Sequence, residues 1–226
     1  MSAPNKLALF DCDGTLIDSQ HDIVEAMNRA FVAVKLDPPS RPRVLSIIGL
    51  SLPRAMAHLV PHADAEFHEH LSEQYRIAFR TMRAAGSVAE PLYPGIAELL
   101  GSLEEQGWML GVATGKSDRG LKSCLTNHGL IDKFVTLQTA DRHPSKPHPS
   151  MAHTAIAEAG ARPETTVIIG DTSFDMQLAQ NAGTAALSVS WGYHEAEELL
   201  AAGAHAVALD MDDLARHIAA HDFARS

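Results

Sequence analysis

Two patterns of apolar and polar positions divide this chain. Residues 18–85 repeat apolar side chains at helical spacing, in stripes that begin at Ile23 and at Leu71. Outside that stretch, short continuous apolar runs are typical of strands that are buried on both faces. These runs occupy residues 6–10, 108–113, 134–137, 166–170 and 185–190.

Helical segments separate the strand-like runs in the second half of the chain. Strands that alternate with helices form βαβ units, and these place the strands side by side in a parallel sheet. The sequence therefore predicts an α/β fold. The separating helices are expected to begin near Gly95, Arg119, Pro149, Asp175 and Glu195.

The helical stretch after the first strand is too long for a single crossover connection, because it spans about seventy residues. We expect it to form an inserted helical cap domain, residues 18–90. The catalytic core would then consist of residues 1–17 and 91–226. The two junctions would lie next to each other above the sheet, so the insertion would cover that end of the core as a lid.

Composition excludes some classes of function. A net charge of -10 argues against binding to nucleic acid, whose phosphates require a basic surface. No apolar run approaches the roughly 20 residues that span a bilayer, and no basic-then-apolar leader begins the chain. The two cysteines, Cys12 and Cys124, lack metal-type spacing, and a structural disulfide is not expected. We expect a cytoplasmic monomer or homodimer that acts on a small molecule.

Two acids directly follow the first predicted strand, where open α/β sheets bind their ligands. Asp11 can attack phosphorus, while Asp13 can give a proton to the leaving oxygen and later take one from water. Gly14 lets the chain turn sharply, and the Thr15 hydroxyl is expected to bond locally. A calcium loop of this type would need a Glu at its twelfth position, where the chain has Asp22, so that alternative fails.

Two further motifs follow the second and third predicted strands. Thr114 and Gly115 offer a hydroxyl and backbone amides that can hold phosphoryl oxygens. Lys146, in a proline-flanked segment, can direct its ammonium group at the phosphoryl group and at Asp11. Taken alone, each motif is equally typical of an ordinary turn or a solvated loop.

The fourth predicted strand ends in two acids. Asp171 would complete an oxygen-ligated metal site with the Asp11 carboxylate and the Asp13 backbone carbonyl, and such hard ligands suit Mg²⁺. Asp175 could reach the metal through water or orient Lys146. The alternative is structural: Asp171 would cap a helix and Asp175 would lie in its first turn.

A histidine-rich stretch gives a weaker metal signal. His58 and His62 are four residues apart but Pro61 lies between them, and the nearby His68 and His70 offer no clear pair on one helical face. We expect a solvated helical surface there.

The motifs together, in this order and spacing, resemble those of the haloacid dehalogenase superfamily of aspartate-nucleophile phosphotransferases. The resemblance covers nearly the whole chain. It implies a Rossmann-like parallel sheet with helices on both faces and a small helical cap inserted after the first motif. The four motifs correspond to residues 11–19, 114–116, 146–149 and 170–175.

The resemblance also distinguishes between chemistries. Dehalogenating members lack an acid two residues after the nucleophile, and phosphonate-cleaving members lack it too and use a cap lysine. This chain has Asp13, and its expected cap loop, residues 45–54, contains no lysine. The resemblance therefore implies a Mg²⁺-dependent phosphatase of a small phosphorylated metabolite, with an aspartyl-phosphate intermediate. Its catalytic residues would be Asp11, Asp13, Thr114 and Lys146, and its metal-binding residues Asp11, Asp13, Asp171 and Asp175.

The substrate is less well determined by the sequence. Overall resemblance makes phosphoglycolate hydrolysis the leading candidate, while a phosphomutase of the β-phosphoglucomutase type, a pyrophosphatase, a nucleotidase and a non-catalytic regulatory scaffold stay open. Residues 48–51 resemble the cap loop that meets the core site in related enzymes, and Gly49 would allow close backbone approach there. Arg54 could pair with a substrate carboxylate. Together with Thr114, Gly115 and Lys146, these are the expected substrate-binding residues.

Overall fold

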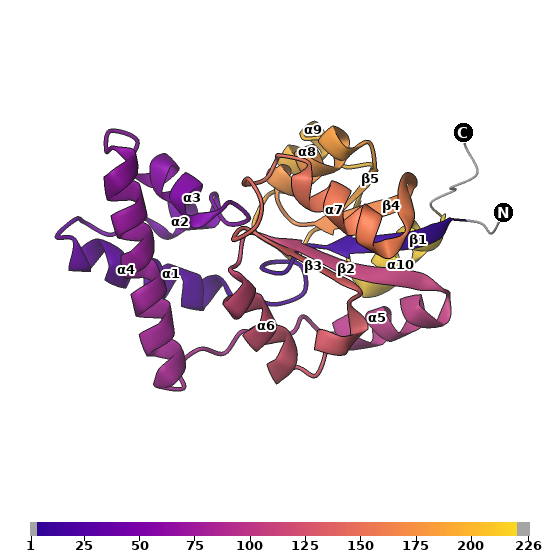
Figure 1. Ribbon diagram of the computed structural model, residues 1–226, viewed down its shortest axis with the longest axis horizontal. Helices are drawn as coiled ribbons and strands as arrows, with labels where there is room; N and C mark the ends of the chain where they lie inside the picture. The colour runs from indigo at the N-terminus through magenta and orange to yellow at the C-terminus, as the bar shows by residue number, and fades with distance from the viewer. Residues whose placement is uncertain (1–3, 221–226) are drawn as a thin grey trace.

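The computed structural model describes residues 4–220 and divides them between a helical lobe and a sheet-containing core (Figure 1). The core sheet has six strands in the order β3-β2-β1-β4-β5-β6, all neighbouring pairs parallel. The order changes direction between β1 and β4, which is where sheets of this kind bind ligands. The strands are β1 (Asn5–Phe10), β2 (Trp108–Thr114), β3 (Thr136–Thr139), β4 (Ala161–Gly170), β5 (Ala185–Val189) and β6 (Ala206–Ala208).

Helices cover both faces of the sheet, as expected. In β1, Leu7 and Leu9 point into one apolar layer while Ala8 and Phe10 point into the other, so the strand is buried on both sides. The Leu7 layer is closed by α7 (Ser150–Ala159), α8 (Ser173–Ala182) and α9 (Ala196–Ala201). The Phe10 layer is closed by α5 (Ile96–Glu105), α6 (Asp118–Asn127) and α10 (Met211–Ala220). A short 3-10 helix, η1 (Ile131–Lys133), precedes β3.

The largest differences from the prediction are in β3, in β4 and near the end of the chain. β3 begins at Thr136, the residue that pairs with Gly111, while the 52% exposed Val135 donates only its backbone amide to Leu110 O of β2. β4 begins at Ala161, and its polar first half pairs with β1 only at Asn5. β6 and α10 were not predicted, since three residues of Ala-Val-Ala carry almost no strand signal.

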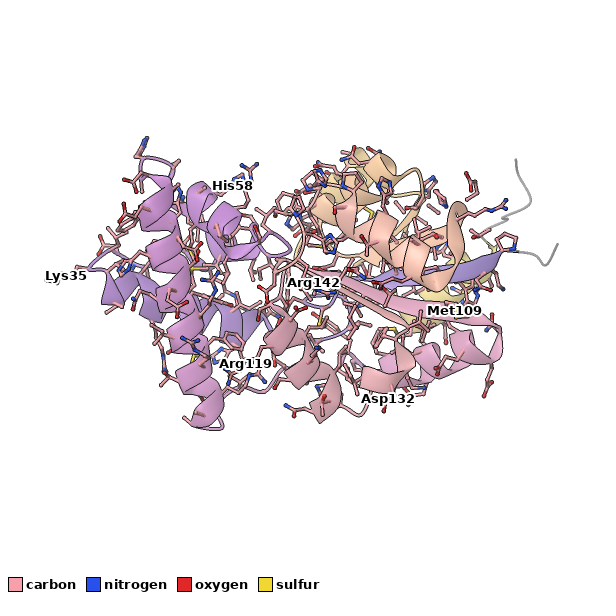
Figure 2. All side chains as sticks on the ribbon, in the orientation of Figure 1. Lys35, His58, Met109, Arg119, Asp132 and Arg142 are labelled. Atoms are coloured by element: carbon pink, nitrogen blue, oxygen red, sulfur yellow. The ribbon has the colours of Figure 1, made fainter. Side chains whose placement is uncertain are left out.

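The helical lobe consists of α1 (Gln20–Ala33), α2 (Arg41–Leu45), α3 (Leu52–Leu59) and α4 (Ala65–Ala84). It has its own apolar cluster, in which the predicted stripes that contain Ile23 and Leu71 pack together. His58 lies on the outer surface of α3 (Figure 2). None of the helices within residues 4–220 combines the length and the apolar composition that a membrane span requires.

The two junctions of the helical lobe lie side by side. The backbone amide of Asp18 donates to Pro91 O at 2.8 Å, and Ile17 forms an isolated bridge with Leu92. The lobe also contacts the core directly, because Ser51 N donates to Ser145 Oγ at 2.9 Å. These contacts hold the loop before α3 against the loops at the carboxyl ends of the strands.

Candidate active site

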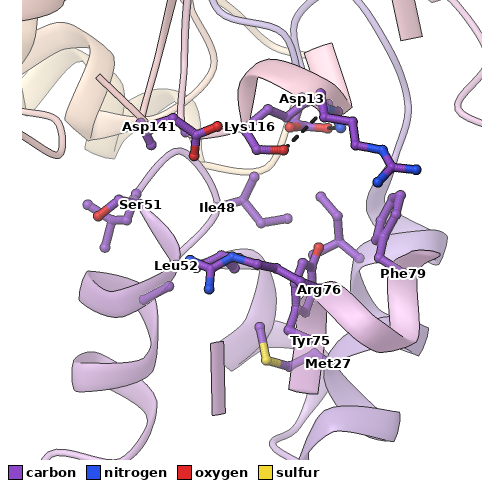
Figure 3. A pocket seen from close by; sticks show the side chains of 18 of the residues that line it. Asp13, Met27, Ile48, Ser51, Leu52, Tyr75, Arg76, Phe79, Lys116 and Asp141 are labelled. Carbon is purple, nitrogen blue, oxygen red and sulfur yellow. Dashed lines mark hydrogen bonds and ion pairs between the residues drawn. The ribbon is translucent and has the colours of Figure 1, made fainter. Parts of the chain in front are cut away.

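The helical lobe and the carboxyl end of the sheet enclose a pocket of about 540 Å³. Figure 3 shows Asp13 and Lys116 at one end of it, with Met27 and Tyr75 on the opposite side. Gly49 and Gly115 also line the pocket, as their predicted role in substrate binding requires. The pocket therefore opens onto two of the loops in which the sequence predicts the chemistry, those that contain Asp13 and Gly115.

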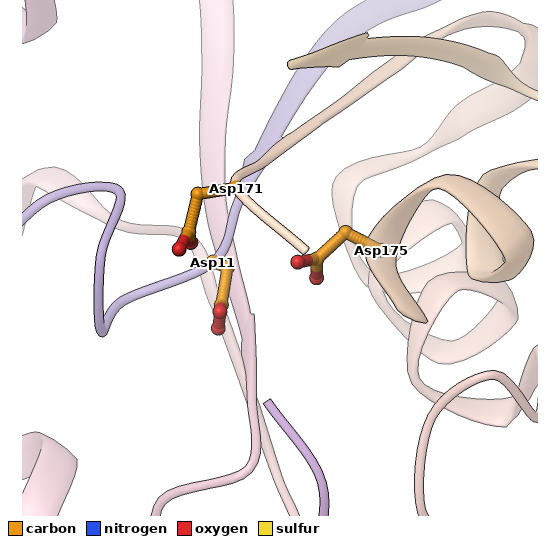
Figure 4. A group of neighbouring side chains, drawn as sticks. All are labelled: Asp11, Asp171 and Asp175. Carbon is orange, nitrogen blue, oxygen red and sulfur yellow. The ribbon is translucent and has the colours of Figure 1, made fainter. Parts of the chain in front are cut away.

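Three acids meet beside this pocket, at the point where the strand order changes direction. Asp11 directly follows β1 and Asp171 directly follows its neighbour β4, while Asp175 comes from the first turn of α8 (Figure 4). One carboxylate oxygen of each lies within 4.8 Å of the others, and all three residues are buried. The parallel sheet thus brings together acids that are separated by about 160 positions in the sequence.

Lys146 neutralises part of this charge. Its Nζ lies 2.9 Å from Asp11 Oδ1 and 2.5 Å from Asp175 Oδ1, and the side chain is fully buried. Burial alone would lower the pKa of Lys146, but Asp11 and Asp175 raise it above its ordinary value. The lysine therefore stays charged against the candidate nucleophile.

The cluster nevertheless holds more negative than positive charge. Burial, with contributions from Asp175 and Asp13, raises the pKa of Asp11 to about 7 although Lys146 lowers it. Burial, Asp11 and Asp175 together raise the pKa of Asp171 well above its ordinary value. Apart from the Lys146 ion pair, neither carboxylate oxygen of Asp11 has a polar partner within residues 4–220. A divalent cation with oxygen ligands fits these residues, because it would stabilise their ionised forms.

Asp171 is fixed by two donors. Thr15 Oγ1 donates to Oδ1 at 2.8 Å, and the backbone amide of Tyr193 donates to Oδ2 at 3.0 Å. The expectation of a local Thr15 bond is therefore wrong, because its partner lies 156 residues away on the neighbouring strand's loop. Gly14, with φ +84°, makes this approach possible, since a Cβ there would lie 2.1 Å from Asp171 Oδ2.

Asp175 contacts Thr172 at the start of α8 and also the charged Lys146. Its Oδ2 accepts from Thr172 N at 3.2 Å, which is one of the two bonds of the capping box of α8, and also from Thr172 Oγ1 at 2.6 Å. The N-cap of this helix is therefore Thr172 and not Asp171. Because Oδ2 is occupied by the cap and Oδ1 by Lys146, Asp175 is placed to orient that lysine.

Asp13 lies at the end of a row of alternating charges that we call the charge chain: Arg83, Glu90, Lys116 and Asp13. Lys116 Nζ lies 2.9 Å from Asp13 Oδ1 and 2.8 Å from Glu90 Oε1. Arg83, near the end of α4, lies 2.7 Å from Glu90 Oε2. Asp13 also accepts a hydrogen bond from the Ser19 hydroxyl. The charge chain connects the helical lobe to Asp13, the predicted acid–base residue.

Sequence reasoning missed three members of the charge chain, since Arg83 was not singled out at all. Lys116 belongs to the second motif but received no role, and Glu90 was taken as part of the junction. Burial opposes ionisation of both, yet Lys116 and Arg83 lower the pKa of Glu90, and Asp13 and Glu90 raise the pKa of Lys116. The one available signal was a lysine directly after Thr114 and Gly115, at the end of a strand.

The remaining predicted residues lie in different surroundings. Thr114 is buried at the end of β2, and its Oγ1 accepts from Lys116 N at 3.2 Å. A Cβ at Gly115 would lie 2.6 Å from Leu50 O and 2.9 Å from Gly49 O, so the absence of a side chain at Gly115 allows the backbone of the helical lobe to approach the core closely. Arg54 is exposed on α3 and is not among the residues that line the pocket. Its assignment to the substrate stays a prediction.

The other candidate residues take no part in this site. Within residues 4–220, the three aspartates form the one cluster of possible metal ligands, and it contains no histidine. In the histidine-rich stretch, His68 Nε2 contacts Val60 O at 2.9 Å. Cys12 and Cys124 are buried, free thiols.

Comparison with known proteins agrees with this geometry. The model of the haloacid dehalogenase-like hydrolase family matches residues 8–189. The chain belongs to this family. The match begins in β1 and ends with β5, so it includes all four motifs and the inserted helical lobe.

Relatives of known name support the same assignment. A Dickeya dadantii protein named "Probable phosphatase IndB" is 36% identical over 87% of this chain and 86% of its own length. A Vibrio vulnificus protein named phosphoglycolate phosphatase is 30% identical, over 87% and 88% of the two chains. A crystal structure of a hydrolase from Pseudomonas syringae is 28% identical and superposes with a TM-score of 0.84, covering 95% of this chain and 98% of that one.

Proposed function

We propose that this protein is a Mg²⁺-dependent phosphatase that hydrolyses a small phosphate monoester through an aspartyl-phosphate on Asp11. The main support is the buried contact of Asp11 with Lys146, next to Asp171 and the pocket. A carboxylate held by a cation, with no hydrogen-bond partner within the described residues, is suited to act as a nucleophile. The phosphatase names of the relatives support the reaction class.

In the first step, a carboxylate oxygen of Asp11 attacks phosphorus and forms a new P–O bond. The ester P–O bond breaks, its electron pair stays on the leaving oxygen, and Asp13 supplies the proton. Asp13 lines the pocket, so the leaving group would be released into that space. Lys146, the Thr114 hydroxyl and the Gly115 backbone amide would hold the phosphoryl oxygens.

In the second step, Asp13 accepts a proton from water as the water oxygen attacks phosphorus. The P–O bond to Asp11 breaks, which restores the carboxylate and releases inorganic phosphate. The charge chain would keep Asp13 in place through both steps, because Lys116 contacts its carboxylate directly.

The cofactor would be held by the Asp11 and Asp171 carboxylates and the Asp13 backbone carbonyl. Bound there, Mg²⁺ would offset negative charge on the phosphoryl group. Asp175 would act indirectly, by orienting Lys146 through their ion pair.

We further propose that residues 18–90 act as a cap that excludes water and contacts the leaving group. Phosphoglycolate is the first ester to test, because it is the substrate in the name of the Vibrio vulnificus relative.

The experiment is release of inorganic phosphate from a panel of phosphate monoesters, with Mg²⁺ and with chelator. We expect chelator-sensitive release that is lost in Asp11→Asn. Equal release by purified Asp11→Asn would refute the assignment of the nucleophile. A phosphomutase would instead conserve the phosphate ester, and analysis of the products would show this.

A further inference from the structure

The sides of the pocket next to Asp13 differ in polarity. Its floor, contributed by the helical lobe, is apolar and aromatic (Figure 3). A leaving group that extends from phosphorus beside Asp13 across the pocket would reach this floor. The side chains concerned are Ile23, Met27, Ile48, Leu52, Tyr75 and Phe79.

The size of the pocket exceeds what a very small leaving group needs. Pockets of about 300–1,000 Å³ with mainly apolar walls hold ligands of drug size. This pocket, at about 540 Å³, lies well inside that range. Glycolate is a two-carbon acid and would leave most of the apolar floor uncovered.

The aromatic part of the floor is suited to a planar ring. Tyr75 and Phe79 are neighbours on α4 with ring centroids 5.9 Å apart, and Met27 faces them from α1. Aromatic and thioether side chains pack favourably against rings. The Tyr75 hydroxyl has no hydrogen-bond partner within residues 4–220, so it is available to a polar edge of the ligand.

Most cations of the pocket are already paired. Arg76 lies 2.8 Å from Glu69, and Arg80 lies 2.7 Å from Glu73. Arg83 and Lys116 are held in the charge chain. In the described part of the chain, Arg119 is the one pocket cation without a carboxylate partner, and it is exposed. The ion pairs of Arg76 and Arg80 are solvent-exposed and weak, so the pocket cations do not select against a second anionic group, and the choice of substrate rests on the apolar floor.

We propose that the substrate is a phosphate monoester whose alcohol carries a planar ring, and that this ring binds against Tyr75 and Phe79, with the buried Met27 beneath them. The inference rests on the proposed phosphatase function and narrows its substrate class. Arylalkyl phosphates and nucleoside monophosphates belong to this class, and phosphoglycolate does not.

The test compares kcat/KM for ethyl phosphate, 2-phenylethyl phosphate, uridine 5′-monophosphate and phosphoglycolate, with Mg²⁺. Ethyl phosphate and 2-phenylethyl phosphate have leaving groups of similar basicity and differ mainly in the aromatic ring of the second. Burial of a ring of this size should raise kcat/KM by roughly 10- to 100-fold over ethyl phosphate. At least one ring-bearing ester should also exceed phosphoglycolate. Preference for phosphoglycolate, or no gain from the ring, would overturn the proposal.

Variants test the location of the ring. Phe79→Ala should lower the ratio of kcat/KM for 2-phenylethyl over ethyl phosphate by about tenfold. Ile77→Ala, on the outer side of the same helix and 42% exposed, is the matched control and should leave the ratio unchanged. If Phe79→Ala fails to fold, Leu52→Gln at the partly exposed start of α3 provides the same measurement. An unchanged ratio in the folded variant would contradict the assignment.

The panel also separates this proposal from the one on which it rests. Turnover restricted to phosphoglycolate would keep the phosphatase and reject the ring-bearing substrate. If wild type releases no phosphate from any ester, including p-nitrophenyl phosphate, the proposed function itself fails.

Discussion

Replacement of Lys116 by methionine would test the charge chain most sharply. Among residues 4–220, Lys116 is the one cation that contacts both Asp13 and Glu90. Its side chain is 10% exposed, and those of Asp13 and Glu90 are 9% and 4% exposed. Methionine preserves most of the length and apolar volume of the side chain. The substitution would therefore leave two carboxylates in the protein interior with one cation fewer.

The expected loss of stability follows from the partners that stay in place. Removal of one member of a buried ion pair typically costs about 3–5 kcal/mol. Glu90 would keep its ion pair with Arg83 at 2.7 Å, and Asp13 would keep its hydrogen bond from the Ser19 hydroxyl. We therefore expect a loss of stability at the lower end of this range. A loss of about 3 kcal/mol in a chain of this size corresponds to a Tm lower by about 6–12 °C.

Denaturant unfolding would measure this loss, followed by tryptophan fluorescence and by far-UV circular dichroism to check that both probes report one transition. Lys122→Met, on the exposed side of α6, is the control and should change the free energy of unfolding by less than about 0.5 kcal/mol. A double-mutant cycle with Glu90→Gln should show coupling. If Lys116→Met unfolds like the control, or the coupling is near zero, the reasoning about the charge chain is wrong.

Three further predictions concern single residues. Because Lys116 and Arg83 outweigh burial and lower the pKa of Glu90 from 4.5, its contribution to stability is present above about pH 4.5 and is lost as pH falls through the lowered value. Glu90→Gln should therefore reduce Tm at pH 7 and flatten its fall on acidification; a parallel fall in both proteins would contradict this. Asp13→Ala should lower kcat/KM, which reports the steps up to release of the alcohol, by roughly 10²–10⁴-fold for ethyl phosphate and much less for p-nitrophenyl phosphate, because nitrophenolate leaves without a proton. An equal fall in kcat/KM for both esters would argue against the role of Asp13 as the acid. Asp171→Ala should weaken Mg²⁺ affinity at least about tenfold in calorimetric titration, whereas unchanged affinity would remove it from the metal site.

Much of the site could be predicted because its signals are local. An apolar run shows where a strand ends, and a parallel sheet places all such ends at one edge. Asp11 and Asp171 therefore had to meet once β1 and β4 were neighbours. The helices of the inserted lobe could be predicted equally well, because the spacing of their apolar residues depends only on nearby positions in the sequence.

The rest depends on contacts that the sequence does not encode locally. Lys116 and Glu90 pair across 26 positions, and Glu90 lies in an irregular junction whose path the sequence does not specify. Thr15 could reach Asp171 only after two loops had packed around Gly14. The early start of β4 and the short β6 follow from pairing with neighbouring strands and not from their own composition.

The central claim is that Asp11 carries the phosphoryl group. The most direct measurement is rapid acid quench during turnover, followed by mass spectrometry of the peptide that contains Asp11. With p-nitrophenyl phosphate, whose leaving group needs no proton, Asp13→Asn lacks only the predicted base for the second step, so a species heavier by one phosphoryl group should accumulate, with fragmentation placing it on Asp11. Asp11→Asn should show none. Turnover by wild type with no phosphorylated Asp11 in either active protein or Asp13→Asn would contradict the account.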